Sequence, residues 1–342
     1  MSWSDIFPVL DENMVAAYQA EATPDEKRDL GRLFQIERIF NPRPAKHIVS
    51  TSLFWKPTRA VEPDYPAPSR AVMEDPEKFG LSSRFESPWD HYVVPLLTTA
   101  HTLRAKRPDL TLRVYLAHDL AFLIGELTTA DCEIYLMKSS SLRHNPGAMW
   151  RFLAMEDEAL VTICDSDRAH ELLHNVERTE LLATGALKYW RTPYFPGEVG
   201  GNYGCPSTYR STNACHFGAA TSLPIRLLAE ALLWNVARKK IETRCTVSPL
   251  KIPIYGTNWP DYGYDEYFLN TAVYPRMAKE GILTLLYRRD QSHSYWLALD
   301  LEFCAKANSN SETLHWGSSW EEPVDTEVEI NPNRHFPKTE TS

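Results

Sequence analysis

The sequence lacks the long apolar runs of membrane proteins. No stretch approaches the eighteen or so consecutive apolar residues that a spanning helix needs, and no signal segment is visible at the amino end. The six cysteines form no C-x-x-C pair, so we expect buried thiols rather than disulfides or zinc ligands. Gly197, Gly200, Gly201 and Gly204 form no G-x-G-x-x-G motif that opens a helix, so no dinucleotide loop is predicted there. We expect a cytoplasmic protein with no membrane span.

Basic residues are outnumbered by acidic ones. The chain has 36 Lys and Arg against 45 Asp and Glu, a formal net charge of -9. This balance argues against broad electrostatic capture of nucleic acid or of an anionic membrane. With 342 residues, 43% of them hydrophobic, the chain can bury one large α/β core or two modest domains.

The chain divides into three predicted parts. These are an N-terminal helical extension (1–45), a main α/β domain (46–320) and an acidic C-terminal tail (321–342). Helical spacing of apolar residues predicts helices over 11–18 and 24–40 in the extension. The segment 192–222 has little periodicity and many Gly, Pro, Tyr and Asn residues, and we interpret it as a mobile flap.

Strands and helices alternate through the middle of the chain. This alternation predicts a mostly parallel, Rossmann-like sheet flanked by helices on both faces. Strands are predicted over 47–55, 111–118, 132–137, 159–164, 282–287 and 294–303, and helices over 89–106, 121–127, 149–155, 169–184, 222–240 and 263–279.

Two carboxylates follow the predicted strand 159–164. Asp165 and Asp167 share a face if the chain stays extended, and they lie at the end of the strand where open α/β sheets bind ligands. Their oxygens suit Mg²⁺ or Mn²⁺ holding a diphosphate. A solvated turn or a helix cap is the alternative interpretation.

The order of motifs around this pair resembles nucleotide-sugar glycosyltransferases of GT-A fold, in particular the glycogenin and galactosyltransferase-like group. Arg151 within a short helix, the partial match Ala154-Met155 to an "LP" element, and the strand ending in Asp165-x-Asp167 follow the order of that group.

Three later segments extend the resemblance over most of residues 47–320. Asn213-Ala214 resembles the N-A-G element that lines the donor sugar, with Cys215 in place of the glycine. Residues 264–270 (YDEYFLN) resemble the D-Q-x-x-L-N element near the reacting centre, and 315–320 (HWGSSW) resemble the late H-x-G-x-x-K-P-W element. The usual lysine of that late element is missing, and Arg288 or Arg289 could supply the phosphate contact.

The resemblance implies a role for each of these positions. It implies a Mn²⁺ or Mg²⁺ site at Asp165, Asp167 and His315, with His293 or His335 as other options for the third ligand. The implied catalytic residues are Asp265, Glu266 and Asn213, and the implied donor-binding residues are Arg151, Asp165, Ser166, Ala214, Gly317 and Ser52.

The function implied by the resemblance is transfer of a sugar from a nucleotide diphosphate-sugar, in particular a UDP-sugar, with a lean toward retention of configuration. The acceptor stays open among a glycan, a protein or a small molecule, and the acidic charge disfavours a modified DNA base. Two alternatives remain, namely a metal-dependent nucleotidyltransferase or hydrolase, and a non-catalytic nucleotide-sugar-binding module.

Structural alternatives exist for individual residues. Arg151 could instead pair with Glu156 or Asp157 and pin its helix. Asp265 could complement the dipole of the helix that it opens. His216 is expected to be structural. The aromatic residues between 255 and 268 could form a stacking wall for an acceptor or part of the core.

Overall fold

The computed structural model describes residues 9–55, 67–81, 85–139, 147–167, 172–185, 187–193, 212–241, 249–252, 257–260, 264–289, 294–298 and 315–316. Within them, no helix is long and apolar enough to cross a membrane.

The centre of the molecule is a ten-stranded mixed sheet in the order β1-β4-β3-β2-β5-β7-β6-β10-β11-β12. Strands β4, β3, β2, β5, β6, β10 and β12 run in one direction, and β1, β7 and β11 run in the other. The fold is therefore α/β with a mostly parallel sheet, compatible with the predicted Rossmann-like arrangement. A separate hairpin pairs β8 with β9. The strands are β1 (Ile36–Phe40), β2 (His47–Leu53), β3 (Thr111–Leu116), β4 (Glu133–Met137), β5 (Leu160–Ile163), β6 (Tyr189–Pro193), β7 (Thr212–Ala219), β8 (Pro249–Ile252), β9 (Thr257–Pro260), β10 (Ile282–Arg289), β11 (Ser294–Ala298) and β12 (His315–Trp316).

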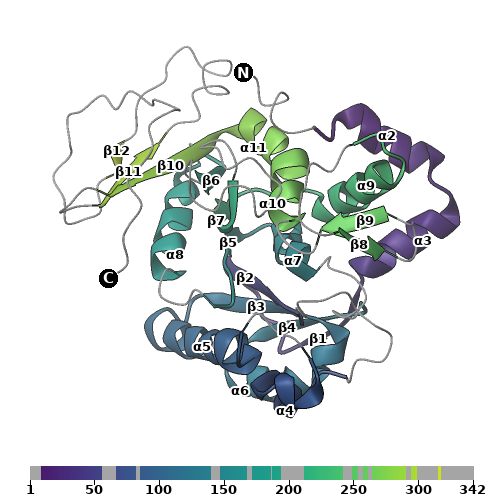
Figure 1. Ribbon diagram of the computed structural model, residues 1–342. Helices are drawn as coiled ribbons and strands as arrows, with labels where there is room; N and C mark the ends of the chain where they lie inside the picture. Colours follow the sequence, from purple (N-terminus) through teal and green to yellow (C-terminus); the bar gives the residue numbers. More distant parts are fainter. Residues whose placement is uncertain are drawn as a thin grey trace.

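Helices cover both faces of the sheet. In Figure 1, α8 lies on one side of β5 and β7, and α7 and α10 lie on the other. The α-helices are α2 (Glu12–Glu21), α3 (Pro24–Leu33), α4 (Arg70–Glu74), α5 (Val94–Lys106), α6 (Ile124–Thr129), α7 (Gly147–Trp150), α8 (Leu172–Leu181), α9 (Ile225–Ala237), α10 (Tyr264–Phe268) and α11 (Tyr274–Glu280). Shorter 3-10 or π turns are η1 (Glu77–Phe79), η2 (Trp89–Val93), η3 (His118–Leu123), η4 (Arg151–Glu156), η5 (Leu182–Thr184) and η6 (Leu269–Val273).

The order of the strands reverses between β2 and β5. Starting from β2, the chain adds β3 and then β4 on one side, and returns to place β5 on the other side. This is the 3-2-1-4 order of doubly wound sheets, in which ligands bind outside the carboxyl ends of the strands where the order reverses. The carboxyl end of β5 is therefore the place at which a ligand is expected.

The N-terminal segment differs from the prediction. The helix predicted over 24–40 ends at Leu33, and Ile36–Phe40 forms the edge strand β1, antiparallel to β4. The helical spacing of the apolar residues was misleading because hydrogen bonding to β4 satisfies the backbone that a longer helix would have satisfied. Helix α2 packs on α9, where the Tyr18 hydroxyl donates to Glu230 at 2.7 Å.

The segment interpreted as a flap also contains regular structure. Residues 212–219 form β7, which lies antiparallel between β5 and β6, and β6 begins before the segment at Tyr189. The prediction was wrong for these residues because both strands are fully paired inside the sheet, where sheet hydrogen bonds and burial outweigh a weak local pattern. Residues 194–211 lie outside the described part of the chain.

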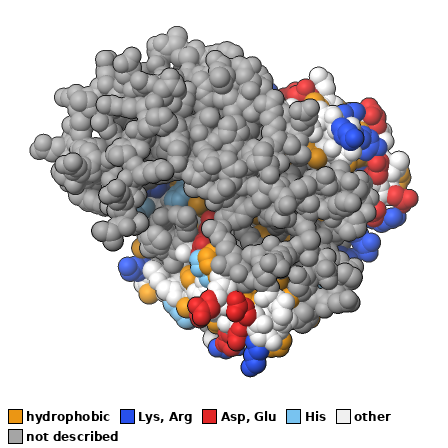
Figure 2. All heavy atoms as spheres, in the orientation of Figure 1, with side chains coloured by type: hydrophobic (Ala, Val, Ile, Leu, Met, Phe, Trp, Pro, Cys, Tyr) orange, Lys and Arg blue, Asp and Glu red, His pale blue; other side chains and the backbone are white. Residues whose placement is uncertain are grey.

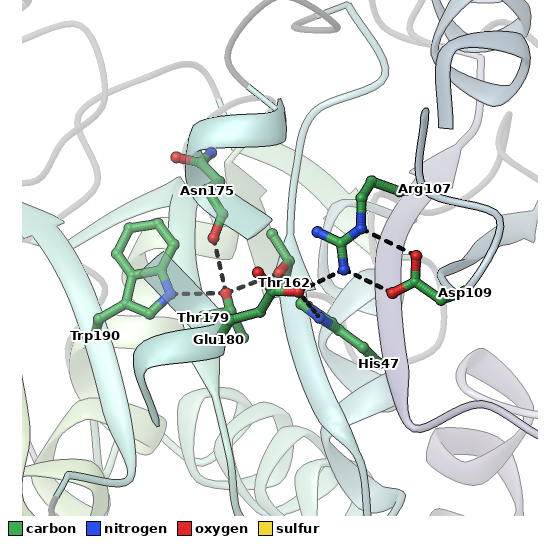
Figure 3. A network of polar contacts seen from close by, with 8 residues as sticks. All are labelled: His47, Arg107, Asp109, Thr162, Asn175, Thr179, Glu180 and Trp190. Carbon is green, nitrogen blue, oxygen red and sulfur yellow. Dashed lines mark hydrogen bonds and ion pairs between the residues drawn. The ribbon is translucent and has the colours of Figure 1, made fainter. Parts of the chain in front are cut away.

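A network of polar side chains, shown in Figure 3, lies near the amino ends of the central strands. His47 Nε2 lies 2.8 Å from the Thr162 hydroxyl, which donates to Thr179. The Thr162 hydrogen is thereby used, so His47 carries its proton on Nε2 and donates. Its Nδ1 has no hydrogen-bond partner among the described residues and lies 4.0 Å from Glu180.

This arrangement predicts a pH-dependent stability. Burial lowers the pKa of His47 to about 4 from 6.5, against the opposing charge of Glu180. Between these values the unfolded chain binds the proton and the folded chain does not, so stability falls as pH falls through this window. The full loss is on the order of 3 kcal/mol. Urea unfolding at pH 7 and pH 5 should give a smaller difference for His47→Gln than for the wild type, whereas His174→Gln, at a half-exposed position on α8, should behave as the wild type does.

Candidate functional site

The aspartate pair lies where the strand order places a ligand. Asp165 follows β5 at its carboxyl end, and Asp167 lies two residues further on. The parallel register that pairs Ser50 with Ile163 places Ser52 beside Asp165 when it is continued. The side chains of Asp165 and Asp167 are 34% and 28% exposed, so both remain accessible to a ligand, whereas Ser166 between them is buried.

Arg151 is delivered to this pair by the short segment α7 and η4. Its own carbonyl accepts a hydrogen bond of 2.7 Å from Ser50 on β2. The preceding Trp150 is fully buried, donates to the Leu33 carbonyl and packs edge-on against Phe54. Gly147 permits this approach, because a Cβ there would lie 2.5 Å from the Phe54 ring. The backbone of Arg151 is therefore fixed from two sides.

The Arg151 guanidinium joins two carboxylates from distant parts of the chain. Nη1 donates to Asp165 after β5, and Nη2 donates to Asp265 at the start of α10. The Arg151 side chain is only 6% exposed. Burial acts to lower its pKa, but the charges of Asp165 and Asp265 outweigh burial and raise the pKa. Arg151 is thus a fixed cation that holds both carboxylates in place.

The alternative prediction, in which Arg151 pairs with Glu156 or Asp157, is wrong. Asp157 pairs with Arg113 at 2.6 Å, and Glu156 accepts from the backbone N–H of Arg226 at 2.6 Å. The short sequence distance to Glu156 and Asp157 suggested a helical pair, but the turn η4 is a 3-10 helix and its Arg points to the crevice end of β5.

Asp265 and Glu266 bring a second acidic pair to Arg151. Both residues are buried, each at 8% exposure. Burial, followed by the charge of Asp265 and a hydrogen bond with it, raises the pKa of Glu266 well above its ordinary value. The raised pKa favours the protonated form of Glu266, whereas Asp265 forms an ion pair with Arg151. A carboxyl group with a raised pKa next to a second carboxylate is suited to acid–base chemistry.

A Glu266→Gln variant tests the raised pKa of Glu266. The folded protein retains a proton on Glu266 that the unfolded chain loses above about pH 4.5. Wild-type stability should therefore decrease as pH rises from that value toward the folded pKa, and the amide should remove this dependence. We expect the variant to gain stability relative to the wild type between pH 4 and pH 8 in urea unfolding. An equal difference at both pH values would contradict the assignment, and Glu77→Gln at an exposed position serves as the control.

Asn270 links this acidic pair to β7. Its side-chain amide accepts from the Thr212 backbone N–H at 2.8 Å and donates to the Glu266 carbonyl at 2.8 Å. Asn213 and Ala214, which the resemblance places at the donor sugar, follow Thr212 on the same strand. Ala214 is fully buried, and the Asn213 side chain lies outside the described side chains.

Cys215 lies near the same centre. The antiparallel register of β5 and β7 pairs Ile163 with Phe217, and its continuation places Cys215 opposite Asp165. Cys132, Cys164 and Cys215 are buried free thiols, as expected. Burial raises the pKa of Cys164 to about 12, so this thiol stays protonated.

His315, the third metal ligand that the resemblance implies, does not lie near Asp165 and Asp167 in the described sheet. His315 lies in β12, five strands from β5 in the sheet, which corresponds to roughly 24 Å at about 4.8 Å per strand. Gly317, His293 and His335 lie outside the described residues. Arg288 and Arg289 lie in β10, but their side chains are not described. Among the described residues, no group of three or more His, Cys, Asp or Glu side chains is arranged to hold a metal ion.

The structure brings a residue to the pair that the sequence did not indicate. His91 Nε2, from the π turn η2 before α5, lies 3.3 Å from Asp167 Oδ2. The Phe85 ring stacks on the imidazole, and the Tyr92 ring meets it edge-on. The 74 or so residues between His91 and Asp165 carry no motif that would have paired them.

Two of the aromatic residues in the predicted stacking wall belong to the core. Tyr267 and Phe268 are 1% and 0% exposed, and Phe268 packs against Phe152. His216 lies on β7 and is half-buried, and nothing described assigns it to the candidate site.

The described residues also line a cavity elsewhere. An open cavity of about 560 Å³ lies at the amino end of β5, lined among others by Lys46, Glu158 and Ser222. It is at the opposite end of the strand from Asp165, and it lacks paired carboxylates. We therefore place the candidate site at the carboxyl end of β5 and not at this cavity.

On the face shown in Figure 2, acidic and basic side chains are interspersed over the described surface.

Comparison with known proteins adds no assignment. The chain matches no family model, no curated protein and no solved structure.

Proposed function

We propose that the chain is a metal-dependent glycosyltransferase of GT-A type that uses a nucleotide diphosphate-sugar, UDP-sugar in particular. One observation carries the proposal: Arg151 joins Asp165, at the crevice end of β5, to Asp265 at the start of α10. This arrangement unites the implied donor side, at Asp165 and Asp167, with the implied reacting side, at Asp265 and Glu266. The order of motifs along the sequence supports the same proposal.

The donor oxygens and nitrogen at Asp167 and His91 fit a divalent ion of the Mn²⁺ type. When bound, such an ion offsets charge that develops on a leaving diphosphate. The diphosphate-sugar would lie across the ends of β2 and β5, beside Ser52. Arg151 orients Asp165 and Asp265 through its two ion pairs, and Asp265 would hold a sugar hydroxyl. The pKa of Glu266, next to Asp265, is raised above its ordinary value, which suits a carboxyl group that would take up the acceptor's proton as a general base.

Calorimetry against UDP-, GDP- and ADP-sugars, each with and without Mn²⁺, tests the proposal. We expect one nucleotide-sugar to bind in a metal-dependent way, and mass spectrometry of a treated lysate to detect a sugar added to an acceptor. Absence of metal-dependent nucleotide binding would overturn the transferase assignment. Turnover of a nucleotide or phosphoester without an acceptor product would favour a hydrolase or nucleotidyltransferase, and binding without turnover would favour a non-catalytic module.

A further inference from the structure

We propose that His91 and Asp167 are the protein ligands of a divalent transition-metal ion, which water and a diphosphate complete. The diphosphate in this inference rests on the proposed function, whereas the choice of the two protein ligands rests on the spacing and orientation of their side chains. It assigns the imidazole ligand to η2, which precedes α5, and not to the late segment that contains His315.

The separation of the two ligand atoms fits a shared ion. Nε2 of His91 and Oδ2 of Asp167 are 3.3 Å apart. Two ligands that each lie about 2.1 Å from an ion are separated by roughly 3.0 Å at a right angle and roughly 3.4 Å at a tetrahedral angle. A charge-assisted hydrogen bond would be shorter, about 2.7–2.9 Å. The separation of 3.3 Å is therefore compatible with a shared ion and is longer than a charge-assisted hydrogen bond.

The imidazole is held in place by its surroundings. The Phe85 and His91 rings are nearly parallel, at 16°, with centroids 3.4 Å apart, and the Tyr92 ring stands at 88° to the imidazole. The His91 backbone N–H donates to the Ser87 carbonyl at 3.0 Å. These contacts restrict the ring plane, and Nε2 is the ring nitrogen nearest to Asp167. A pre-oriented ligand loses less entropy when the ion binds.

The pair is also open enough to bind an ion with its waters. The His91 and Asp167 side chains are 33% and 28% exposed. Asp165 already accepts from Arg151, so it contributes its charge to the site while its Oδ1 is engaged. A site with two protein ligands is sufficient when phosphate oxygens and water fill the remaining positions, as is usual for ions that hold nucleotides. The nitrogen ligand favours Mn²⁺ or a later transition metal over Mg²⁺.

Pulsed electron paramagnetic resonance of bound Mn²⁺ provides a direct test. An imidazole ligand should give a ¹⁴N coupling in the wild-type protein, with and without UDP. We expect His91→Ala to remove this coupling and to weaken Mn²⁺ binding by at least about tenfold, since even outer partners of metal ligands cost 10- to 100-fold. His315→Ala should keep both the coupling and the affinity.

The outcomes separate this inference from the proposed function. A ¹⁴N coupling that survives His91→Ala, or disappears in His315→Ala, would overturn the inference. Failure of the wild-type protein to bind Mn²⁺ would overturn it as well. Imidazole-coupled Mn²⁺ in a protein that binds no nucleotide-sugar would support the ligand assignment and overturn the transferase proposal. Circular dichroism of His91→Ala, expected to match the wild type, excludes misfolding as the cause, and His91→Asp should restore Mn²⁺ binding without the ¹⁴N signal.

Discussion

Replacement of Arg151 by alanine is expected to destabilise the protein by about 3–5 kcal/mol, because removal of one partner from a buried ion pair leaves uncompensated charge behind. Here the loss leaves Asp165 and Asp265 near each other without the cation that both of them contact. Burial and the charge of Asp265 raise the pKa of the neighbouring Glu266, and this carboxyl group has no positive charge that could replace the guanidinium. Chemical denaturation at pH 8 measures the effect.

The pH dependence distinguishes this cause from simple loss of packing. Without Arg151, the folded-state pKa of the two aspartates should rise, so acid should stabilise the variant relative to the wild type. The destabilisation should therefore be smaller at pH 5 than at pH 8. A loss of equal size at both pH values would indicate packing instead of charge. Arg28→Ala is the matched control, because Arg28 pairs with Asp25 at the surface with 61% of its side chain exposed and should change stability by less than about 1 kcal/mol.

Much of the central sheet could be predicted from the sequence. The strands before and after the helices, such as β2, β3 and β5, agree with the predicted ranges to within a few residues. Short apolar runs bounded by polar residues are sufficient to predict these strands, because the strands are buried on both faces. The same logic placed Asp165 and Asp167 at the carboxyl end of β5, where the strand order reverses.

Long-range pairing could not be predicted in the same way. β1 and β7 are strands because β4, β5 and β6 supply hydrogen-bond partners, and a local pattern contains no information on those partners. The resemblance brought Arg151 and Asp265 into one list of site residues, but their direct contact, 114 positions apart, depends on how α7 and α10 pack. His91 could not be found at all, since no motif marks it. The sequence therefore indicated where these residues lie along the chain, but not which of them are in contact.

The second large effect is expected for Asp167→Asn. If Asp167 binds the metal ion, an amide there lacks the charge and one carboxylate oxygen, and the ion that offsets diphosphate charge is held poorly. We expect metal-dependent sugar transfer or donor hydrolysis to fall at least about 100-fold, equivalent to about 2.7 kcal/mol of transition-state stabilisation. The assay is turnover of the nucleotide-sugar identified by calorimetry, over a series of Mn²⁺ concentrations.

Stability separates Asp167 from its neighbour Asp165. Asp167 is partly exposed and its contact with His91 is at the surface, so Asp167→Asn should change the free energy of unfolding by less than about 1 kcal/mol. Asp165→Asn should lose both activity and stability, because the buried Arg151 guanidinium would lose one of its two carboxylate partners. Unchanged activity in Asp167→Asn would remove the metal assignment. If activity falls in both variants but stability falls only in Asp165→Asn, then Asp167 serves the ion directly, whereas Asp165 also maintains the arrangement of the site.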